Sequence, residues 1–291
     1  MPNLELPSSL VSVQWLADAL ANKPSELIVL DASWHMPAAQ RDGEAEWRQV
    51  RIRGSRFFDF DRRICDRDAT LPHMMPDASV FTSEMQRLGI DKDSVVVIYD
   101  SLGIQTSPRA WWMLKSMGLE QCAVLDGGLP AWQAAGFDID IEEPSEKPFN
   151  GNFTANFHAS MFCDWREVLL ATSSENTRIL DARSADRFYG RAPEPRAGLR
   201  SGHMPGALSL PFDRLIVDGH MRPAQELQAA LQSLLHKDVH RLIATCGSGV
   251  TSCVIAFAAY LVGYRDISVY DGSWSEWGAG DKLPVTCAPA N

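Results

Sequence analysis

The sequence predicts an α/β fold built from two tandem domains, each with a mainly parallel sheet flanked by helices. Three observations support this prediction. The chain contains an internal repeat whose matching positions lie about 145 to 150 residues apart. Short β-branched runs without polar alternation recur between helical patterns, as in parallel sheets that are buried on both faces. A polar stretch that holds Pro, Gly and Asn separates the two copies, as expected for a linker.

The repeat is visible in four pairs of segments. These pairs are 27–33 with 177–183, 51–61 with 199–213, 94–114 with 240–260, and 123–132 with 268–277. A repeat of this length is too long for a solenoid unit and fits a duplicated domain. We therefore predict an N-terminal domain over residues 1–142, a linker over 143–157 and a C-terminal domain over 158–291.

Within each copy, short apolar runs alternate with helical patterns. In chain order, the expected strands are 27–30, 95–99 and 123–125 in the first copy and 179–180, 242–245 and 267–270 in the second. The stretches 108–117 and 251–262 are expected to be helices. This alternation predicts the α/β class.

Composition and charge exclude several classes of protein. With 45% hydrophobic and 22% charged residues, the 291-residue chain is typical of a globular protein with a substantial core. A net charge of −10 argues against general nucleic-acid binding. No apolar run approaches the roughly 20 residues that cross a bilayer, and the N-terminus lacks the pattern of a secretory signal. We therefore expect a cytoplasmic protein without a membrane partner.

The six cysteines favour neither disulfides nor a metal. They lie at positions 65, 122, 163, 246, 253 and 287 and include no C-x-x-C pair, so neither a disulfide framework nor a zinc site is expected. Only Cys246 has a local setting that suggests chemistry, because it lies between an apolar strand and the loop GSGVTS. Asp100 occupies the matching position of the first copy. If the thiol reacts, only the second copy carries it.

A strand, a tight glycine-containing loop and a helix N-terminus together form a nest of backbone N–H groups that binds an anion. Such a setting lowers the pKa of a thiol from its free value of about 8.5. Gly247 and Gly249 would supply the conformational freedom of the loop. A phosphatase loop of the type C-x5-R is excluded, because Ser252 is the sixth residue after Cys246. Spacing does not exclude a cysteine protease, but a closed nest suits a sulfur atom better than a peptide.

Several motifs extend the pattern beyond CGSGVTS at 246–252. They are LPHMMP (71–76), SPRAWWML (107–114), EPRAG (194–198), SGHMPGALSLPF (201–212) and DGSWSEWG (271–278). Together they resemble the 3-mercaptopyruvate sulfurtransferase branch of the two-domain rhodanese family over nearly the whole chain. The resemblance implies two tandem rhodanese-like domains, of which the second is catalytic. It also implies an enzyme that moves sulfur from 3-mercaptopyruvate, through a Cys246 persulfide, to a thiol or cyanide and releases pyruvate, with no cofactor.

The donor is expected to be a carboxylate. Gly247 and Ser248 are neutral, whereas thiosulfate-specific relatives carry basic residues after the cysteine. The stretch 178–203 holds six arginines against three acidic residues, a charge that attracts anions, and a guanidinium binds a carboxylate through two hydrogen bonds. The resemblance assigns this task to Arg187 and Arg196. Backbone N–H groups of the loop are expected to hold the terminal sulfur; the residues are Gly247, Ser248, Gly249, Val250 and Thr251.

The resemblance further implies a Ser–His–Asp relay of Ser248, His73 and Asp61 that faces the thiol. A hydroxyl backed by an oriented imidazole delivers the proton that the departing pyruvate enolate needs. His73 and Asp61 come from the first copy. One extra residue separates the aspartate and the histidine relative to the family pattern, so Asp59 is a rival for Asp61.

The remaining predictions concern packing and partners. Cys253 is expected to be packed in the following helix, with a disulfide to Cys246 as a minor alternative, and Trp274 and Trp277 are expected in the core or the wall of the cleft. The acceptor is expected to be a small thiol or reduced thioredoxin. Three alternatives stay open: a thiosulfate sulfurtransferase, a non-enzymatic persulfide carrier, and a binding module that has lost activity.

Overall fold

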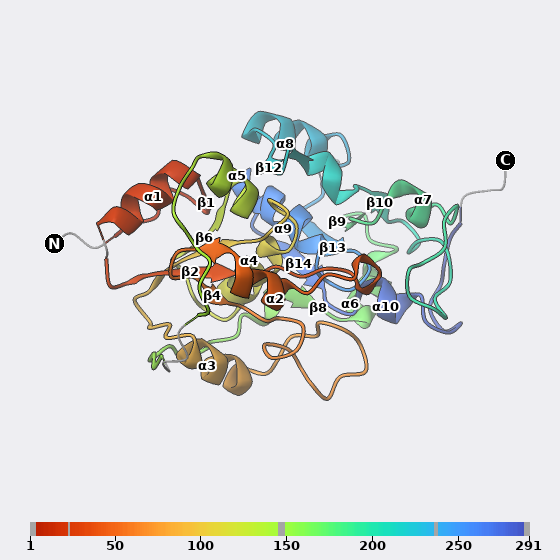
Figure 1. Ribbon diagram of the computed structural model, residues 1–291. Helices are drawn as coiled ribbons and strands as arrows, with labels where there is room; N and C mark the ends of the chain where they lie inside the picture. Colours follow the sequence, from red (N-terminus) through yellow and green to blue (C-terminus); the bar gives the residue numbers. More distant parts are fainter. Residues whose placement is uncertain (1–3, 23, 145–148, 236–237, 288–291) are drawn as a thin grey trace. The chain divides into compact units, whose positions relative to one another are not determined.

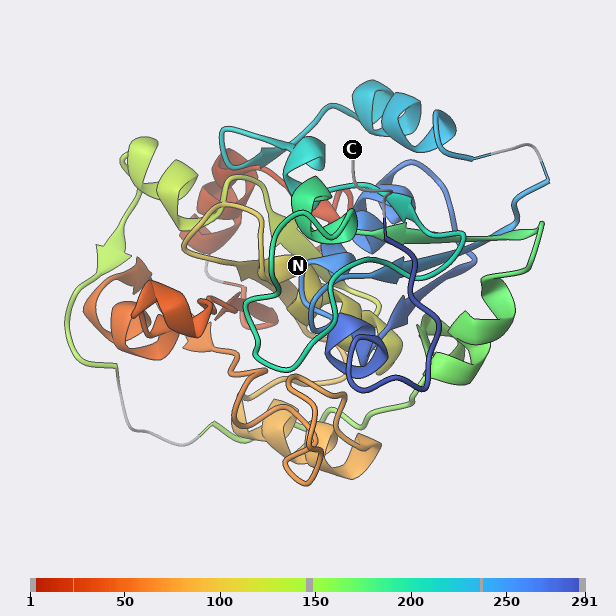
Figure 2. The same cartoon turned by 90° about the vertical axis from the view of Figure 1, so that its right-hand side faces the viewer.

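The computed structural model describes residues 4–22, 24–144, 149–235 and 238–287 and divides into two compact units. Unit 1 takes its described residues from Met1–Arg67, Met75–His158 and Asp218–Met221, and unit 2 takes them from Asp68–Met74, Ala159–Val217 and Arg222–Asn291. Each unit contains a five-stranded parallel sheet with flanking helices (Figure 1 and Figure 2). The predicted fold class is confirmed. No helix among the described residues is long and apolar enough to span a bilayer.

Unit 1 has the strand order β1-β6-β5-β2-β4, and every neighbouring pair in this sheet is parallel. Its strands are β1 (Leu10–Val11), β2 (Leu27–Asp31), β3 (Arg51–Ile52), β4 (Arg56–Phe57), β5 (Val95–Tyr99), β6 (Cys122–Leu125), β7 (Ile139–Asp140) and β12 (His220–Met221). Its helices are α1 (Val13–Ala21), α2 (Gly43–Gln49), α3 (Ala78–Arg87), α4 (Ser107–Ser116), α5 (Gly128–Ala134) and the 3-10 helix η1 (Pro37–Ala39).

Unit 2 has the strand order β10-β9-β13-β14-β8, again all parallel. Its strands are β8 (Phe162–Cys163), β9 (Thr177–Asp181), β10 (Leu208–Ser209), β11 (Ile216–Val217), β13 (Arg241–Thr245) and β14 (Ile267–Tyr270). Its helices are α6 (Trp165–Ala171), α7 (Ala185–Phe188), α8 (Ala224–Gln232), α9 (Ser252–Leu261), α10 (Ser273–Trp277) and the 3-10 helices η2 (Ala159–Met161) and η3 (Phe212–Leu215). When this sheet is read from β8 to β10, its strand order corresponds to that of unit 1 read from β1 to β4.

The central strands follow the predicted pattern closely. The expected strands at 95–99 and 267–270 coincide with β5 and β14, and the other four are longer in the structure by one to three residues. Every residue of β5, β6 and β14 is buried, which explains why these runs lack polar alternation. The helices α4 and α9 each begin and end one residue away from the expected bounds.

The expected linker, residues 143–157, lies partly outside the described residues. Its later part belongs to unit 1. Phe153 is buried, its ring centroid lies 6.3 Å from that of Phe81 in α3, and its N–H donates to the carbonyl of Ile90. This stretch is therefore held along α3 by both apolar and backbone contacts.

The two sheets differ at one buried carboxylate. The strands β2 and β9 end in Asp31 and Asp181, and both side chains are buried. Arg183 neutralises Asp181, with its Nη2 2.6 Å from Asp181 Oδ2. In unit 1 the corresponding residue is Ser33, which donates its N–H and hydroxyl to Asp31 without bringing a positive charge. Burial raises the pKa of Asp31 to about 7, and the hydrogen bonds from Ser33 oppose this rise only in part.

We expect Asp31→Asn to stabilise the protein above neutral pH. The folded protein keeps a proton on Asp31 up to about pH 7, whereas the unfolded chain releases it near the ordinary pKa of 3.8. The folded state therefore binds more protons between these values, and the wild-type free energy of unfolding falls as the pH rises through this window. The loss between about pH 5 and about pH 8 is roughly 2 to 3 kcal/mol, and asparagine removes it.

Urea unfolding of both proteins at these two pH values tests this expectation. The exposed Asp93→Asn serves as the control, because the Asp93 side chain is 84% exposed and should change the pH dependence little. If the stability of Asp31→Asn varied with pH as much as that of the wild type, burial of Asp31 would not be the cause.

Candidate active site

Cys246 follows β13 directly and begins the loop that leads to α9. Its side chain is only 2% exposed and its thiol is free. Burial by itself raises the pKa of this thiol, but hydrogen bonds from the Ser252 and Thr251 side chains and from the backbone of Ser252 and Ser248 outweigh burial, so the pKa lies below its ordinary value. The buried Ser252 hydroxyl has no other hydrogen-bond partner among the described residues, so it is directed to the sulfur of Cys246.

Other cysteines show what burial does without such donors. Burial raises the pKa of Cys65, Cys122 and Cys163 above the ordinary value. The lowered pKa of Cys246 thus depends on the hydrogen-bond donors of its loop, as the physics of a backbone nest requires.

In unit 1 the matching loop forms a similar nest of backbone N–H groups, which surrounds the carboxylate of Asp100. The Asp100 carboxylate accepts three backbone N–H groups at 2.9 Å through one oxygen, from Gln105, Thr106 and Ser107. That oxygen also accepts the Ser107 hydroxyl at 2.7 Å. The loop is one residue longer than its counterpart, since Thr106 and Thr251 are the two N-cap residues. The side chain of Asp100 thus fills this nest with its own negative charge.

Ser273 holds the Cys246 loop in place through hydrogen bonds of its hydroxyl group. Its hydroxyl oxygen accepts the N–H of Cys246 at 3.2 Å and that of Gly249 at 3.1 Å, and the hydroxyl donates to the carbonyl of Tyr270 at 2.7 Å. The Gly249 N–H, which we expected to hold the terminal sulfur, donates to the Ser273 hydroxyl. Its contact with that sulfur stays a prediction.

Ser273 is a functional residue that the sequence motifs did not single out, although its backbone conformation marks it. Ser273 has a φ of 48°, a left-handed conformation that costs a non-glycine residue free energy. Its counterpart in the first copy is Gly128, with a φ of 54°. A serine that replaces a glycine at such a position is retained for its side chain, and here that side chain holds the loop.

The two loop glycines have different reasons to be glycine. Gly249 has a φ of 76°, which agrees with the predicted need for conformational freedom. Gly247 is not among the residues with positive φ, so that part of the prediction is wrong. A Cβ atom at Gly247 would lie 3.2 Å from Arg187 Nη2 and 3.7 Å from Arg196 Nη1. Glycine at 247 therefore leaves room for two guanidinium groups beside the loop.

Arg187 and Arg196 thus both lie beside the loop at Gly247; their binding of a substrate stays a prediction. Arg196 Nη2 donates to the Ser248 hydroxyl at 3.3 Å. Arg187 pairs with Glu194, whose side chain is almost completely buried, through its Nε at 3.2 Å and also through Nη2. Glu194 fixes the direction of Arg187 and leaves part of its guanidinium for another acceptor.

The six arginines between 178 and 203 do not form one exposed patch. Arg183 is fully buried between Asp181 and Glu194 and lies 4.0 Å over the ring of Trp274. Arg200 donates to three backbone carbonyls, one of which is that of Leu283 at 2.9 Å. These two arginines stabilise the fold because buried carboxylates and carbonyls need partners. The predicted attraction of anions therefore applies to the arginines at the loop.

His73 lies against Ser248. It belongs to unit 2, although the sequence places it in the first copy, and it is 3% exposed. His73 Nδ1 lies 3.1 Å from the Ser248 hydroxyl oxygen and 3.3 Å from the Ser248 carbonyl oxygen. His73 also has a φ of 62°, a strained value of the kind often found at functional sites.

Asp61 and its rival Asp59 belong to unit 1. The buried Asp59 carboxylate accepts the N–H groups of Asp61 at 3.2 Å and Arg62 at 2.9 Å, and burial raises its pKa. The Asp61 carboxylate lies 4.0 Å from Arg62 Nε. Which of the two carboxylates orients His73 stays a prediction.

The other predicted residues are accounted for by packing. Cys253 is fully buried and is not in a disulfide, and its thiol donates to the carbonyl of Gly249 at 3.3 Å. Trp274 and Trp277 lie in the hydrophobic core of unit 2, which confirms the expectation of core aromatics. Val250 is buried in the loop, and Thr251 caps α9.

Comparison with known proteins adds independent information. The model of the Rhodanese-like domain matches residues 12–135 and 165–279, which correspond to the two copies of the repeat. The 3-mercaptopyruvate sulfurtransferase of Homo sapiens is 37% identical over 284 residues, which cover 95% of this chain and 94% of that protein. The thiosulfate sulfurtransferase of Gallus gallus is 38% identical over 277 residues, with 94% of each chain covered.

A solved structure agrees with these relatives. The crystal structure of SseA from Escherichia coli, described as a 3-mercaptopyruvate sulfotransferase, superimposes with a TM-score of 0.82 at 33% identity. The match covers 92% of this chain and 99% of that one. The similarity therefore extends over both domains and includes the loop that begins at residue 246.

Proposed function

This chain belongs to the rhodanese-like family, and we propose that it is a sulfurtransferase that uses 3-mercaptopyruvate as donor and Cys246 as the sulfur carrier. One observation carries this proposal: a buried thiol with a lowered pKa lies beside a loop glycine that two arginines approach. The names of similar proteins support the donor, since the Homo sapiens relative is a 3-mercaptopyruvate sulfurtransferase.

In the first half-reaction, the Cys246 thiolate attacks the sulfur of 3-mercaptopyruvate. A sulfur–sulfur bond forms as the carbon–sulfur bond breaks, and the electron pair of the broken bond leaves with the carbon as the pyruvate enolate. Arg187 and Arg196 hold the carboxylate and carbonyl of the donor, because guanidinium groups bind such oxygens through paired hydrogen bonds. The enzyme is then a Cys246 persulfide.

The enolate must take up one proton to become pyruvate. Ser248 is the proposed donor, and His73, 3.1 Å from its hydroxyl oxygen, restores the proton to the serine. Asp61, or its rival Asp59, would hold the tautomer of the imidazole. The φ of 62° at His73 supports this role, because the fold keeps the ring at Ser248 despite the strain.

In the second half-reaction, an acceptor attacks the outer sulfur of the persulfide. A thiolate acceptor takes that sulfur and becomes a persulfide, cyanide becomes thiocyanate, and Cys246 leaves as the thiolate. The hydrogen-bond donors that lower the pKa of Cys246 stabilise this leaving group as well. Unit 1 is proposed to be non-catalytic, because Asp100 fills the matching nest.

The acceptor and the cellular location are also proposals. We propose a small thiol or reduced thioredoxin as acceptor, because such a nucleophile returns Cys246 to its thiolate without a cofactor.

A cytoplasmic location is supported by the six cysteines, none of which is in a disulfide, as is usual in reducing compartments.

A side-by-side donor assay tests the proposed function, with pyruvate and thiocyanate both quantified. We expect catalytic efficiency with 3-mercaptopyruvate to exceed that with thiosulfate by at least about a hundredfold, because the residues that follow Cys246 are neutral and the two arginines suit a carboxylate. A reversed ratio would assign the protein to thiosulfate, the donor that the name of the Gallus gallus relative suggests.

The variant Arg196→Gln adds a test of the donor site. Loss of this guanidinium should raise KM for 3-mercaptopyruvate by about ten- to a hundredfold and leave KM for the acceptor nearly unchanged. Arg191→Gln is the matched control, because the Arg191 side chain is 59% exposed and only loosely paired with Asp186. If both variants had the same KM for 3-mercaptopyruvate, Arg196 would not contribute to binding of the donor.

A further inference from the structure

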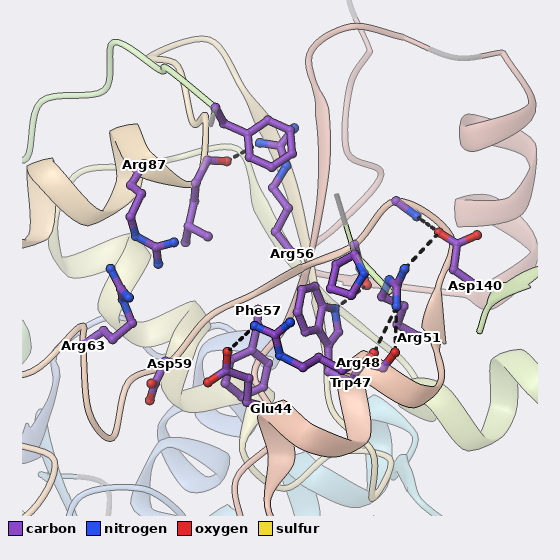
Figure 3. A pocket seen from close by; sticks show the side chains of 15 residues that line it. Glu44, Trp47, Arg48, Arg51, Arg56, Phe57, Asp59, Arg63, Arg87 and Asp140 are labelled. Atoms are coloured by element: carbon purple, nitrogen blue, oxygen red, sulfur yellow. Dashed lines mark hydrogen bonds and ion pairs between the residues drawn. The ribbon is translucent and has the colours of Figure 1, made fainter. Parts of the chain in front are cut away.

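Unit 1 contains a cavity of about 510 Å³ beside the edge strand β4, and five arginines line it (Figure 3). We name it the arginine pocket; its arginines are Arg48, Arg51, Arg56, Arg63 and Arg87. Three acidic residues, Glu44, Asp59 and Asp140, also line it. The lining thus has an excess of two positive charges in a chain with a net charge of −10. The volume is within the range of small-molecule sites, roughly 300 to 1,000 Å³.

The three carboxylates of the pocket are already engaged by protein groups. Asp59 accepts two backbone N–H groups of the loop that follows it. Asp140 Oδ2 accepts the N–H of Gly54 at 2.9 Å. Glu44 lies 3.2 Å from Arg48 across one turn of α2. These partners reduce the repulsion that the carboxylates would exert on an anion in the cavity.

On one side of the pocket, arginines outnumber the carboxylate that they share. Arg63, Arg67 and Arg87 all pair with Glu84, at 3.3, 3.4 and 2.7 Å. Figure 3 shows the side chains of Arg63 and Arg87 extending toward each other at the edge of the cavity. Both remain nearly half exposed, so each keeps N–H donors that a ligand can reach.

Arg56 is the most poorly compensated cation of the pocket. Its Nη1 donates to the carbonyl of Leu88, and its guanidinium lies 3.7 Å from the ring centroid of Phe149. The carboxylate of Asp91 attracts this guanidinium electrostatically, but more weakly than burial disfavours its charge. Burial lowers the pKa of Arg56 because the charged form loses water. A partly buried guanidinium gains free energy when an anion binds beside it.

Two aromatic rings form an apolar part of the same wall. The centroids of Trp47 and Phe57 lie 5.8 Å apart, and both residues line the cavity. Arg51 is held against Trp47 and donates to the carbonyl of Glu142 at 2.7 Å, so it supports the wall. The pocket thus combines positive charge with two aromatic side chains, whose ring planes are tilted by 38° to each other.

We propose that the arginine pocket binds a small phosphate monoester that carries a flat ring. Arg56, Arg63 and Arg87 would take the phosphate, whose double negative charge matches the charge excess of the lining and whose oxygens suit the guanidinium fork. Trp47 and Phe57 would contact the ring. The inference rests on unit 1 alone and is independent of the function proposed for Cys246.

Isothermal titration calorimetry on the full chain tests this proposal with three probes: adenosine monophosphate, inorganic phosphate and adenosine. We expect saturable binding of adenosine monophosphate, weaker binding of phosphate and no measurable binding of adenosine. Arg56→Gln and Arg87→Gln should each weaken binding of adenosine monophosphate by about tenfold or more, since each removes charge-assisted hydrogen bonds.

Two control variants separate this site from other cationic positions. Arg166→Gln removes an exposed arginine that lies 4.6 Å over the ring of Trp165, and Arg196→Gln removes a cation of the Cys246 loop. Both should bind adenosine monophosphate as the wild type does. Loss of binding in Arg196→Gln alone would move the ligand to unit 2 and overturn the proposal.

Three further results bear on the proposal. Absence of saturable binding to the wild type, or unchanged affinity in both pocket variants, would overturn it. Equal affinities for phosphate and adenosine monophosphate would contradict the proposed contact of the ring with Trp47 and Phe57. Thermal unfolding shows whether each variant is folded; if Arg56→Gln is not, Arg87→Gln decides the outcome, because that side chain is 44% exposed.

Discussion

Replacing Cys246 by serine is expected to abolish sulfur transfer, with a loss of at least about a thousandfold in turnover. A serine hydroxyl in the same cradle stays protonated at neutral pH and forms no stable bond to sulfur. The wild type, treated with 3-mercaptopyruvate, should gain the mass of one sulfur atom, and Cys246→Ser should gain none. Intact-protein mass spectrometry and pyruvate release measure the two effects.

Cys253→Ser is the matched control for this experiment. Cys253 is a buried cysteine of the same loop–helix segment that is not in a disulfide, and its thiol donates to the Gly249 carbonyl. This variant should keep the mass gain. A persistent gain in Cys246→Ser would place the carried sulfur on another residue and contradict the proposed function.

Replacing Arg183 by methionine is expected to destabilise the protein by about 3 to 5 kcal/mol. Arg183 is fully buried and is the cation between Asp181 and Glu194, with contacts of 2.6 and 2.8 Å. Methionine fills much of the volume but leaves two buried carboxylates without that charge. Denaturant unfolding at neutral pH measures the loss in the free energy of unfolding.

Arg191→Met is the control for Arg183→Met. The ion pair of Arg191 with Asp186 is exposed and spans 3.9 Å, so its removal should cost no more than about 1 kcal/mol. Similar unfolding free energies for the two variants would show that Arg183 is not the main partner of the buried carboxylates. Arg183→Met should also raise the donor KM, because Glu194 orients Arg187.

Much of the fold follows from local sequence patterns. The runs that become β5 and β14 are apolar throughout and buried throughout, so pattern and burial coincide. The two-residue edge strands, such as β4 and β10, could not be predicted, because so short a strand has no periodicity. Their place depends on pairing with β2 and β9.

The candidate site could be predicted only where its residues are consecutive in the sequence. The nest at Cys246 is continuous in sequence, since a strand, a loop and a helix follow one another within a few residues. Ser273 lies 27 residues further along, and only its contact with the Cys246 and Gly249 amides makes its role visible. Similarly, the six arginines near residue 187 look alike in sequence, and burial separates those that stabilise the core from those at the loop.

The duplication, the parallel α/β class and the place of Cys246 at the start of a nest can be predicted from sequence, because these features arise from residues that are close along the chain. Contacts in the folded protein establish which carboxylate each arginine neutralises, which hydroxyl holds the loop and where unit 1 has an excess of positive charge. Those outcomes depend on distances between distant segments and on the loss of water around charged groups, and neither is encoded in local spacing.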